Sequence, residues 1–312
     1  ADGLDTEIRP FGDEYLLIKW AQTFDESLEE GGALDAGLIR ALWERRRQEG
    51  LSYRAEYGRV GPDYLPRLGF QSRRDFSLYG GGLGYAWFPG TSSPFRTIGF
   101  GVNTEHYYRN ADQTPESRST RPEFLLGFKN GAFFTLSSTT SFESIVDPFE
   151  IAELPIDPGE YWFTEGALSF RGSRGWPVRG SVTTTAGTFY DGTRVSGNIT
   201  PSFNITSHLE VAPSYEINRF VFDDETTLTH LGRLRLDYAL NTHLSLGVFG
   251  QYNSTVDQTS VNARFRYHFR EGTDLWIVYN EGFNLERDLD DPRLPLSVGR
   301  SLLVKYTHTF GF

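Results

Sequence analysis

The sequence of 312 residues contains no cysteine and no methionine. Without cysteine there is no disulfide framework, no thiolate nucleophile and no thiolate metal site. Without methionine there is no initiator residue, and the start at "ADGLDTEIRP" predicts a processed chain that has lost a signal peptide or a larger N-terminal part. Both absences fit an exported bacterial protein.

Long apolar runs and an excess of positive charge are also missing. No stretch approaches the roughly 18 consecutive apolar residues of a membrane-spanning helix. The net charge of −11 argues against a nucleic-acid partner, because phosphate neutralisation requires clustered Lys and Arg. The chain is instead rich in Phe (25), Tyr (16) and Gly (33), a composition typical of strands and turns. In a transmembrane barrel only alternate residues meet lipid, so the mean hydropathy stays polar.

Several segments alternate strictly between apolar and polar residues. In "VNARFRYHFR", Val261, Ala263 and Phe265 fall on one face of a strand, while Arg264 and Arg266 fall on the other. A soluble β-sandwich alternates in the same way. Aromatic residues near the expected strand ends favour a membrane barrel, whose two interfaces carry aromatic girdles. These residues are Tyr85, Trp87, Tyr107, Tyr161, Trp162, Trp176, Tyr190, Tyr215 and Trp276.

Turn signals such as "FKNGAF" and "REGTDL" recur at intervals of roughly 30 to 45 residues, the length of one hairpin. Longer polar or Pro-containing stretches lie between them, which predicts short turns at one end and long loops at the other. The expected strands span 14-23, 36-46, 51-59, 75-88, 95-108, 117-129, 131-142, 160-171, 176-189, 193-204, 208-221, 226-240, 243-253, 259-269, 274-284 and 299-312.

These patterns predict an all-β fold: a transmembrane antiparallel up-and-down β-barrel of about sixteen strands. We expect one domain over residues 1–312, which is either the whole barrel or the C-terminal part of a longer precursor. An even number of strands would bring both ends of the chain to the short-turn side.

Four segments carry a resemblance to a known family: "DEYLLIKWAQTFD", residues 42–90 from "LWERRRQEG" to "AWFPG", residues 248–282 from "VFGQYNSTV" to "VYNEG", and "LPLSVGRSLLVKYTHTFGF". They resemble the C-terminal barrel region of a large bacterial family of unknown function, whose members typically carry a carbohydrate-binding-module-like domain (family nine type) ahead of an outer-membrane barrel. Residues 1–312 resemble only the later part of the family's usual length, without the region of that N-terminal domain. The resemblance implies a location in the bacterial outer membrane and supplies no catalytic residues.

The C-terminal segment predicts an assembly signal. Tyr306, Phe310 and Phe312 stand at alternating positions at the end of the last strand. This arrangement resembles the signal by which outer-membrane barrels are delivered to the barrel assembly machinery. An ordinary last strand of a soluble β-domain is the alternative. We therefore expect two partners, outer-membrane lipid and the assembly machinery, besides a possible protein partner or missing N-terminal part.

A second set of residues is predicted to line the barrel interior. Rings of basic side chains lower the barrier to anions in an aqueous pore. Opposed Arg and Glu side chains can instead simply fill and brace the interior. The candidates are Arg40, Arg54, Glu56, Arg233, Arg235, Asp237, Arg264, Arg266, His268, Arg270 and Lys305.

Other motifs give weaker predictions. Glu286, Asp288, Asp290 and Asp291 are candidate calcium ligands, although their spacing matches no EF-hand and such runs are usually solvated loops. The apolar side chains within "ESIVDPFEIAELPIDPGE" predict a loop that packs against something. No nucleophile elbow or HExxH motif is present, so we expect neither catalysis nor a cofactor.

The sequence thus predicts a porin-like channel or transport barrel with a basic, water-accessible lumen. The alternative is a plugged structural barrel that anchors loops, an N-terminal domain or a partner complex at the cell surface. A soluble carbohydrate-binding β-domain is a third interpretation.

Overall fold

The computed structural model describes residues 1–24, 32–67, 69–223, 225–287 and 292–310, and the regular structure in them is all β-strand. No described helix is long and apolar enough to cross a membrane. The strands are β1 (Asp2–Ile8), β2 (Glu14–Gln22), β3 (Gly37–Arg45), β4 (Gly50–Val60), β5 (Phe76–Trp87), β6 (Phe95–Arg109), β7 (Pro115–Phe128), β8 (Phe133–Ile145), β9 (Phe149–Ile151), β10 (Leu154–Ile156), β11 (Gly159–Arg171), β12 (Val178–Phe189), β13 (Gly192–Asn204), β14 (Leu209–Phe222), β15 (Glu225–Ala239), β16 (Leu244–Asn253), β17 (Gln258–Arg270), β18 (Thr273–Asn284) and β19 (Ser297–His308).

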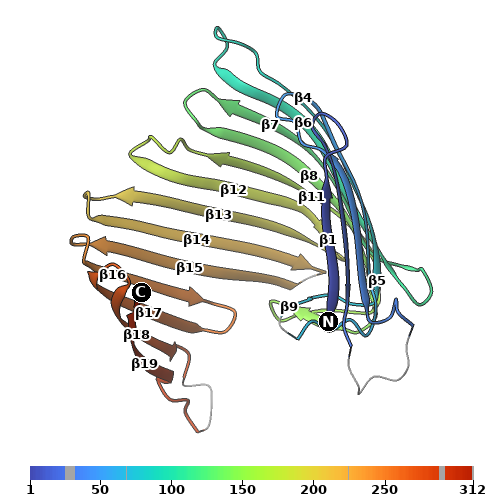
Figure 1. The fold of residues 1–312 in the computed structure, drawn as a ribbon. Coiled ribbons are helices and arrows are strands. Elements are labelled where there is room, and N and C mark those ends of the chain that lie inside the picture. Colours follow the sequence, from blue (N-terminus) through green and yellow to red (C-terminus); the bar gives the residue numbers. More distant parts are fainter. Residues whose placement is uncertain (25–31, 68, 224, 288–291, 311–312) are drawn as a thin grey trace.

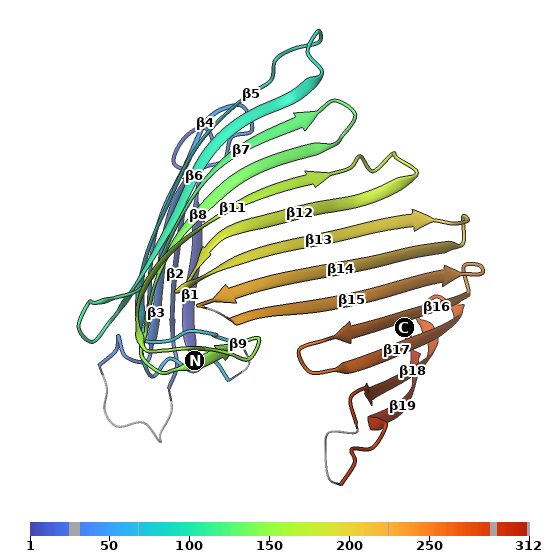
Figure 2. The same cartoon turned by 180° about the vertical axis from the view of Figure 1, so that it is seen from behind.

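Seventeen of these strands form one antiparallel up-and-down sheet, and β9 and β10 form a separate hairpin. Each strand pairs with the next along the chain, and β8 pairs directly with β11 across the hairpin. The ladders continue in this way to β18–β19, the last pairing along the chain. Among the described residues no register joins β19 back to β1 or β2, and the sheet forms no closed barrel. Figures 1 and 2 show a strongly curved sheet whose first and last strands lie apart.

All sixteen predicted strand ranges correspond to a strand of this sheet, but β1 was not predicted. The predicted even number is therefore wrong for this sheet, and so is the placement of both chain ends at the short-turn side. Asp2 at the start of β1 lies opposite Gln22, beside the long connection 23–36. His308 at the end of β19 lies opposite Thr273, beside the short turn 271–272. The first and last strands thus begin and finish at opposite ends of the sheet.

The connections largely follow the predicted asymmetry. At one end they are short, as at 46–49, 129–132, 240–243 and 271–272. Gly131 and Gly272 have φ values of 89° and 72°, a left-handed conformation that glycine adopts without a Cβ clash. At the other end the connections 23–36, 61–75, 146–158 and 285–296 are long, although 190–191 and 223–224 are short.

The two faces of the sheet differ in chemistry. Cross-strand partners share a face, so the registers trace each face from strand to strand. Phe265 lies opposite Leu246 and Ile277 on an apolar face, whereas Arg266 lies opposite Ser245 and Trp276 on a polar face. The sheet curves round the polar face, which we call the inner face, and the apolar convex side is the outer face. The β9–β10 hairpin lies within the curve (Figures 1 and 2).

No large described side chain is fully buried. The larger of two small buried clusters consists of Leu154 and Ile156 from the hairpin, together with Tyr161, Phe163, Phe189 and Phe220 from the inner face of β11, β12 and β14. The alternating strands therefore do not enclose an apolar core of the ordinary kind, and most of their apolar surface lies outside.

Candidate functional site

The inner face gathers the predicted interior residues, which come from strands far apart in the sequence. Lys19 lies opposite Arg40, Arg54 lies opposite Glu44, and Lys305 lies opposite Trp276. The registers place ten of the eleven candidates in this alternation: Arg40, Arg54, Glu56, Arg233, Arg235, Asp237, Arg264, Arg266, His268 and Lys305. Arg270 falls outside it, because a β-bulge after His268 sets Arg270 opposite Thr273.

The inner face of β2 to β8, called the N-terminal wall, carries a connected network of ion pairs. Arg40 Nε donates to Glu56 Oε1 at 2.6 Å, and the other oxygen of Glu56 lies 3.6 Å from Arg54 Nη2. Arg54 Nη2 also donates to Glu105 Oε1 at 3.1 Å. The Glu56 side chain is only 5% exposed, so two guanidinium groups surround a nearly buried carboxylate. These charges largely neutralise one another.

Glycines in β5 allow this network to cross a strand. Arg54 belongs to β4 and Glu105 to β6, with β5 between them. Gly80 lies opposite both Glu56 and Glu105, and Gly82 lies opposite Arg54. A Cβ on Gly80 would stand 3.3 Å from the Glu56 Cβ. The glycines of the "GGGLG" stretch therefore permit close packing, because the side chains of β4 and β6 meet over positions of β5 that have no side chain.

The inner face of β15 to β19, called the C-terminal wall, is different. Arg235 Nε donates to Asp237 Oδ2 at 2.6 Å. In β17 and β18, Arg266 Nε donates to Asp274 Oδ1 at 2.8 Å, and His268 Nδ1 lies 2.9 Å from the same oxygen. These two carboxylates have partners already and are not available to neutralise further cations.

Three cations of the C-terminal wall have no ion-pair partner among the described residues. Arg233 donates only to the amide oxygen of Gln251, at 3.2 Å. The side chains of Arg264 and Lys305 make no hydrogen bond or ion pair within the described part of the chain. The C-terminal wall is thus left with uncompensated positive charge, which the N-terminal wall lacks.

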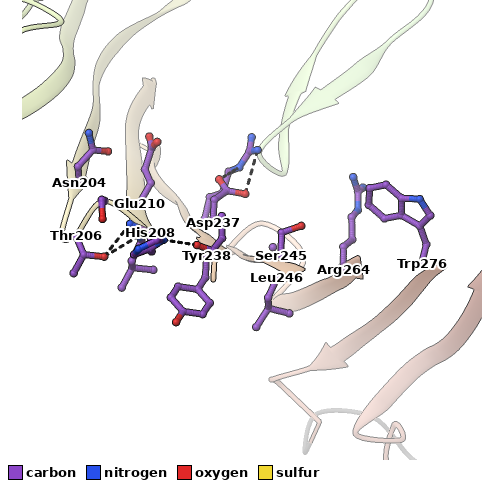
Figure 3. Close-up of a pocket in the computed structure, with 15 residues that line it drawn as sticks. Asn204, Thr206, His208, Glu210, Asp237, Tyr238, Ser245, Leu246, Arg264 and Trp276 are labelled. Carbon is purple, nitrogen blue, oxygen red and sulfur yellow. Dashed lines mark hydrogen bonds and ion pairs between the residues drawn. The ribbon is translucent and has the colours of Figure 1, made fainter. Parts of the chain in front are cut away.

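A hollow of about 750 Å³, lined in part by Arg264, opens at the short-turn end of β14 to β18. Figure 3 shows Glu210, Asp237, Arg264 and Trp276 on one side of the sheet, with Tyr238 and Leu246 pointing away from them. Gly247 lies opposite both Asp237 and Arg264 and leaves the space between them open. The hollow therefore combines an unpaired guanidinium, an indole ring and carboxylates.

The middle of the inner face, on β11 to β14, carries interactions that sequence reasoning missed. Arg194 donates from Nε and Nη2 to the two oxygens of Glu165, at 2.7 and 2.6 Å, and its guanidinium lies 4.4 Å from the centre of the Phe189 ring. Both side chains alternate inward, which the sequence pattern allowed. Their pairing across β12 requires the register, and this could not be read from one sequence.

The β9–β10 hairpin is the predicted packing loop. Leu154 and Ile156 are each 3% exposed, and the Tyr161 hydroxyl donates to the carbonyl of Asp157 at 2.8 Å. Above the cluster, burial and the nearby charge of Glu143 raise the pKa of Tyr190, in the turn after β12, to about 12. The expectation that this loop packs against something is confirmed, and its partner is the inner face itself.

The outer face presents apolar side chains on strand after strand. Leu83, Trp162, Val195 and Leu234 are each more than two-fifths exposed. The predicted girdle is only partly on this face: the registers place Tyr85, Trp87, Trp162 and Tyr215 outward, but Tyr107, Tyr161 and Trp276 inward. The sequence could not separate these sets, because the face of a terminal residue depends on strand register.

The last strand carries two described residues of the predicted assembly signal. Tyr306 lies on the outer face beside Phe269, with ring centres 6.2 Å apart, and is 61% exposed. Phe310 follows the end of β19 and contacts the His308 ring. Phe312 lies outside the described residues.

The weak calcium prediction has no structural support in the described part of the chain. Asp288, Asp290 and Asp291 lie outside it, and the described residues contain no group of three or more metal-binding side chains. A side-chain hydrogen bond with Asp257 and the charge of that neighbouring carboxyl raise the pKa of Glu286.

No protein-family model matches the chain, and no curated protein matches it either. The family resemblance given above therefore stays a prediction.

Proposed function

We propose that this protein is a porin-like channel or transport barrel of the bacterial outer membrane, with the outer face in lipid and the inner face along a water-filled path. The inner face is mostly polar and charged, whereas the outer face is apolar. In water such an outer face would be a severe liability, because soluble monomers rarely expose contiguous apolar patches beyond a few hundred Å². In lipid the same arrangement is the expected one.

The uncompensated cations Arg233, Arg264 and Lys305 are the single observation that carries the channel proposal. A charge that only braces an interior is held by an opposite charge, as Arg40 and Arg54 are. A basic side chain without such a partner stays hydrated and leaves a positive potential along the path. Anions would be favoured there over cations of similar size.

The β9–β10 hairpin narrows the proposed path. It is also the one observation that favours the alternative function, a plugged structural barrel. Because β9 and β10 lie within the curve, they reduce the free cross-section beside β11 to β14. If they leave an opening, the protein conducts. If the path is filled, the same wall serves as a plugged anchor for surface loops or a partner.

Single-channel recording separates these functions. The protein, extracted from membranes in detergent with whatever accompanies it, is placed in a planar bilayer under a salt gradient. We expect steady openings and a reversal potential that shows anion preference. Heat-modifiable migration in gels without any openings would establish the plugged barrel. Extraction without detergent would instead contradict both membrane proposals.

The hairpin gives a matched second measurement. Replacing both Leu154 and Ile156 with Ser removes the apolar contacts that hold the hairpin on the inner face. We expect larger and noisier openings than in the unaltered protein. Val146→Ser is the control, because Val146 is 66% exposed in the same loop and lies outside the buried cluster.

A further inference from the structure

The sheet has two free edges, β1 and β19. Each pairs with one neighbour only, β2 and β18 respectively, among the described residues. The residues of β19 are exposed along nearly its whole length, and β1 is almost as open. About half of the backbone N–H and C=O groups of each edge strand therefore have no strand to pair with in the described part of the chain.

Each edge strand carries charge, Asp5 and Glu7 on β1 and Lys305 on β19, but neither contains a proline. Natural edge strands are commonly blunted by Pro, by bulges or by charges at their centre. The stretch "SLLVKYT" in β19 contains no Pro and pairs with β18 without a bulge from Thr273 to Gly282. A long, flat and apolar edge of this kind would aggregate in water, and in lipid its unpaired backbone groups would each cost several kcal/mol. Both edges are therefore suited to pair with further strands.

The side chains of both edges already follow the two-faced pattern of the sheet. On β1, Leu4 and Ile8 lie outward, and Asp5 lies inward opposite Lys19. On β19, Tyr306 lies outward and Lys305 inward. A neighbouring strand would continue the same alternation, with a base near Asp5 and an acid near Lys305.

The direction of the edge strands restricts what can fill the gap. Because the sheet is an up-and-down meander of 17 strands, an odd number, β1 and β19 run the same way. A direct seam between them would be parallel. A second copy in the same membrane orientation would also meet both edges in parallel. Only an odd number of inserted strands makes every ladder antiparallel and the total even, as in bacterial single-chain barrels.

We propose that the sheet is completed between β19 and β1 by an odd number of antiparallel amphipathic strands, formed by polypeptide outside residues 1–312. The energetic argument for these strands rests on the proposed membrane function. The geometric argument, from the direction of β1 and β19, does not depend on that function. The inserted strands face lipid with apolar side chains and face the path with polar ones, and the closed wall then has no edge.

Photo-crosslinking tests this directly. A photoreactive amino acid replaces Leu4 or Ile8 on β1, and Leu302 or Tyr306 on β19, in the protein as it is made in its own cells. Crosslinked peptides are identified by mass spectrometry. Val195 on β13 is the control, because its outward side chain is similarly exposed and its known neighbours are Ala186 and Arg219.

The order of the captured residues gives the strand direction. We expect peptides from outside residues 1–312 whose residue numbers fall as the probe moves from Leu4 to Ile8, and likewise from Leu302 to Tyr306. A shift in gel mobility shows whether they belong to another chain. Rising numbers, or capture of β19 by a probe on β1, would mean a parallel seam and would overturn the proposal.

The remaining outcomes also support or overturn the proposal of inserted strands. If the Val195 probe captures its known neighbours while all four edge probes capture nothing, the edges are open and the proposal is wrong. A test that needs no probe on an edge uses the cysteine-free background: Leu4→Cys with Leu302→Cys should form no intramolecular disulfide. Extraction of the same samples with and without detergent tests the proposed function separately. If the edge probes capture antiparallel strands but the protein dissolves without detergent, the proposed membrane function is wrong and the inserted strands are still supported.

Discussion

The two walls of the sheet use the same residue types for different purposes. In the N-terminal wall, Glu56 is enclosed by Arg40 and Arg54, and the network reaches Glu105 over the glycines of β5. In the C-terminal wall, Arg264 stands beside Gly247 with no carboxylate to meet it. An inward arginine is therefore not a functional signature in itself. What decides its role is whether the neighbouring strand supplies a carboxylate at the right register.

The largest expected difference between the walls is in stability. Glu56→Gln leaves two guanidinium groups around a nearly buried neutral amide, and we expect a loss of about 1–2 kcal/mol. Asp237→Asn removes a carboxylate that is 45% exposed and paired with an arginine that is 65% exposed, so its effect should stay below about 1 kcal/mol. Urea titration of the heat-modifiable form in lipid vesicles measures both. Equal losses would erase the distinction between the walls.

Glycine substitutions give the next largest contrast. Gly80→Ala brings a methyl group to 3.3 Å from the Glu56 Cβ and should destabilise the sheet by about 1 kcal/mol. Gly247→Ala meets Asp237 Oδ1 at 3.5 Å, an ordinary contact, and should change stability by less than about 0.5 kcal/mol. The same urea titration applies. A Gly80→Ala protein as stable as the unaltered one would show that the network does not need the gap in β5.

Ion preference should respond to Arg264 alone. A unit charge acts on an ion about 10 Å away in water with about 0.4 kcal/mol, so Arg264→Gln should lower the anion-to-cation permeability ratio roughly two- to four-fold. The double variant Arg235→Gln with Asp237→Asn removes a neighbouring ion pair without changing the net charge, and it should leave the reversal potential unchanged. A larger shift in the double variant would assign selectivity to the pair.

The smallest expected effect concerns two acidic residues in the connections. Hydrogen bonds from Thr114 lower the pKa of Asp112, beside the N-terminal wall, whereas the neighbouring Asp257 raises the pKa of Glu286, beside the C-terminal wall. Asp112 therefore contributes stability above its ordinary pKa, and this is lost as the pH falls through its lowered value. Glu286 lowers the stability of the folded protein as the pH rises through its raised pKa, because its charged form is disfavoured in the folded state. Mildly acidic pH removes this destabilisation.

The pH dependence of unfolding in Glu286→Gln and Asp112→Asn proteins checks these signs. We expect Glu286→Gln to flatten the curve on its mildly acidic side, above the ordinary glutamate pKa. Asp112→Asn should flatten it only at lower pH. Curves that coincide with that of the unaltered protein at all pH values would contradict both assignments.

Most of the fold could be predicted from the sequence, because a period of two over ten or more residues specifies a strand and its two faces together. Sixteen strands were placed from this signal. The strand β1 was missed because "DGLDTEI" has acidic residues at three of its seven positions and few residues that favour strands. The hairpin strands are three residues each, too short to show a period, although the apolar loop around them indicated packing.

The inner face was predicted better than the interactions on it. Alternation alone put Arg54, Arg235 and Arg264 on the same face. It could not tell which of them meets a carboxylate, since that depends on cross-strand register: Glu105 reaches Arg54 from 51 residues away along the chain. Arg270 was assigned to the wrong face for a related reason. A single bulge shifts the alternation, and nothing in the local sequence indicates the bulge.

If the protein lies in the outer membrane as proposed, the inward-folded connection between β8 and β11 also determines which loops can be reached from outside the cell. A loop held against the inner face by Leu154 and Ile156 is withdrawn from the exterior, and Tyr64 anchors the connection 61–75 in the smaller buried cluster. The described residues of the connection 285–296 contribute no side chain to either cluster. For a bacteriophage or an antibody, the accessible epitopes would then come from described residues of 285–296, such as the exposed Leu285 and Leu296. Variation under immune or phage pressure should accumulate in them and spare the hairpin.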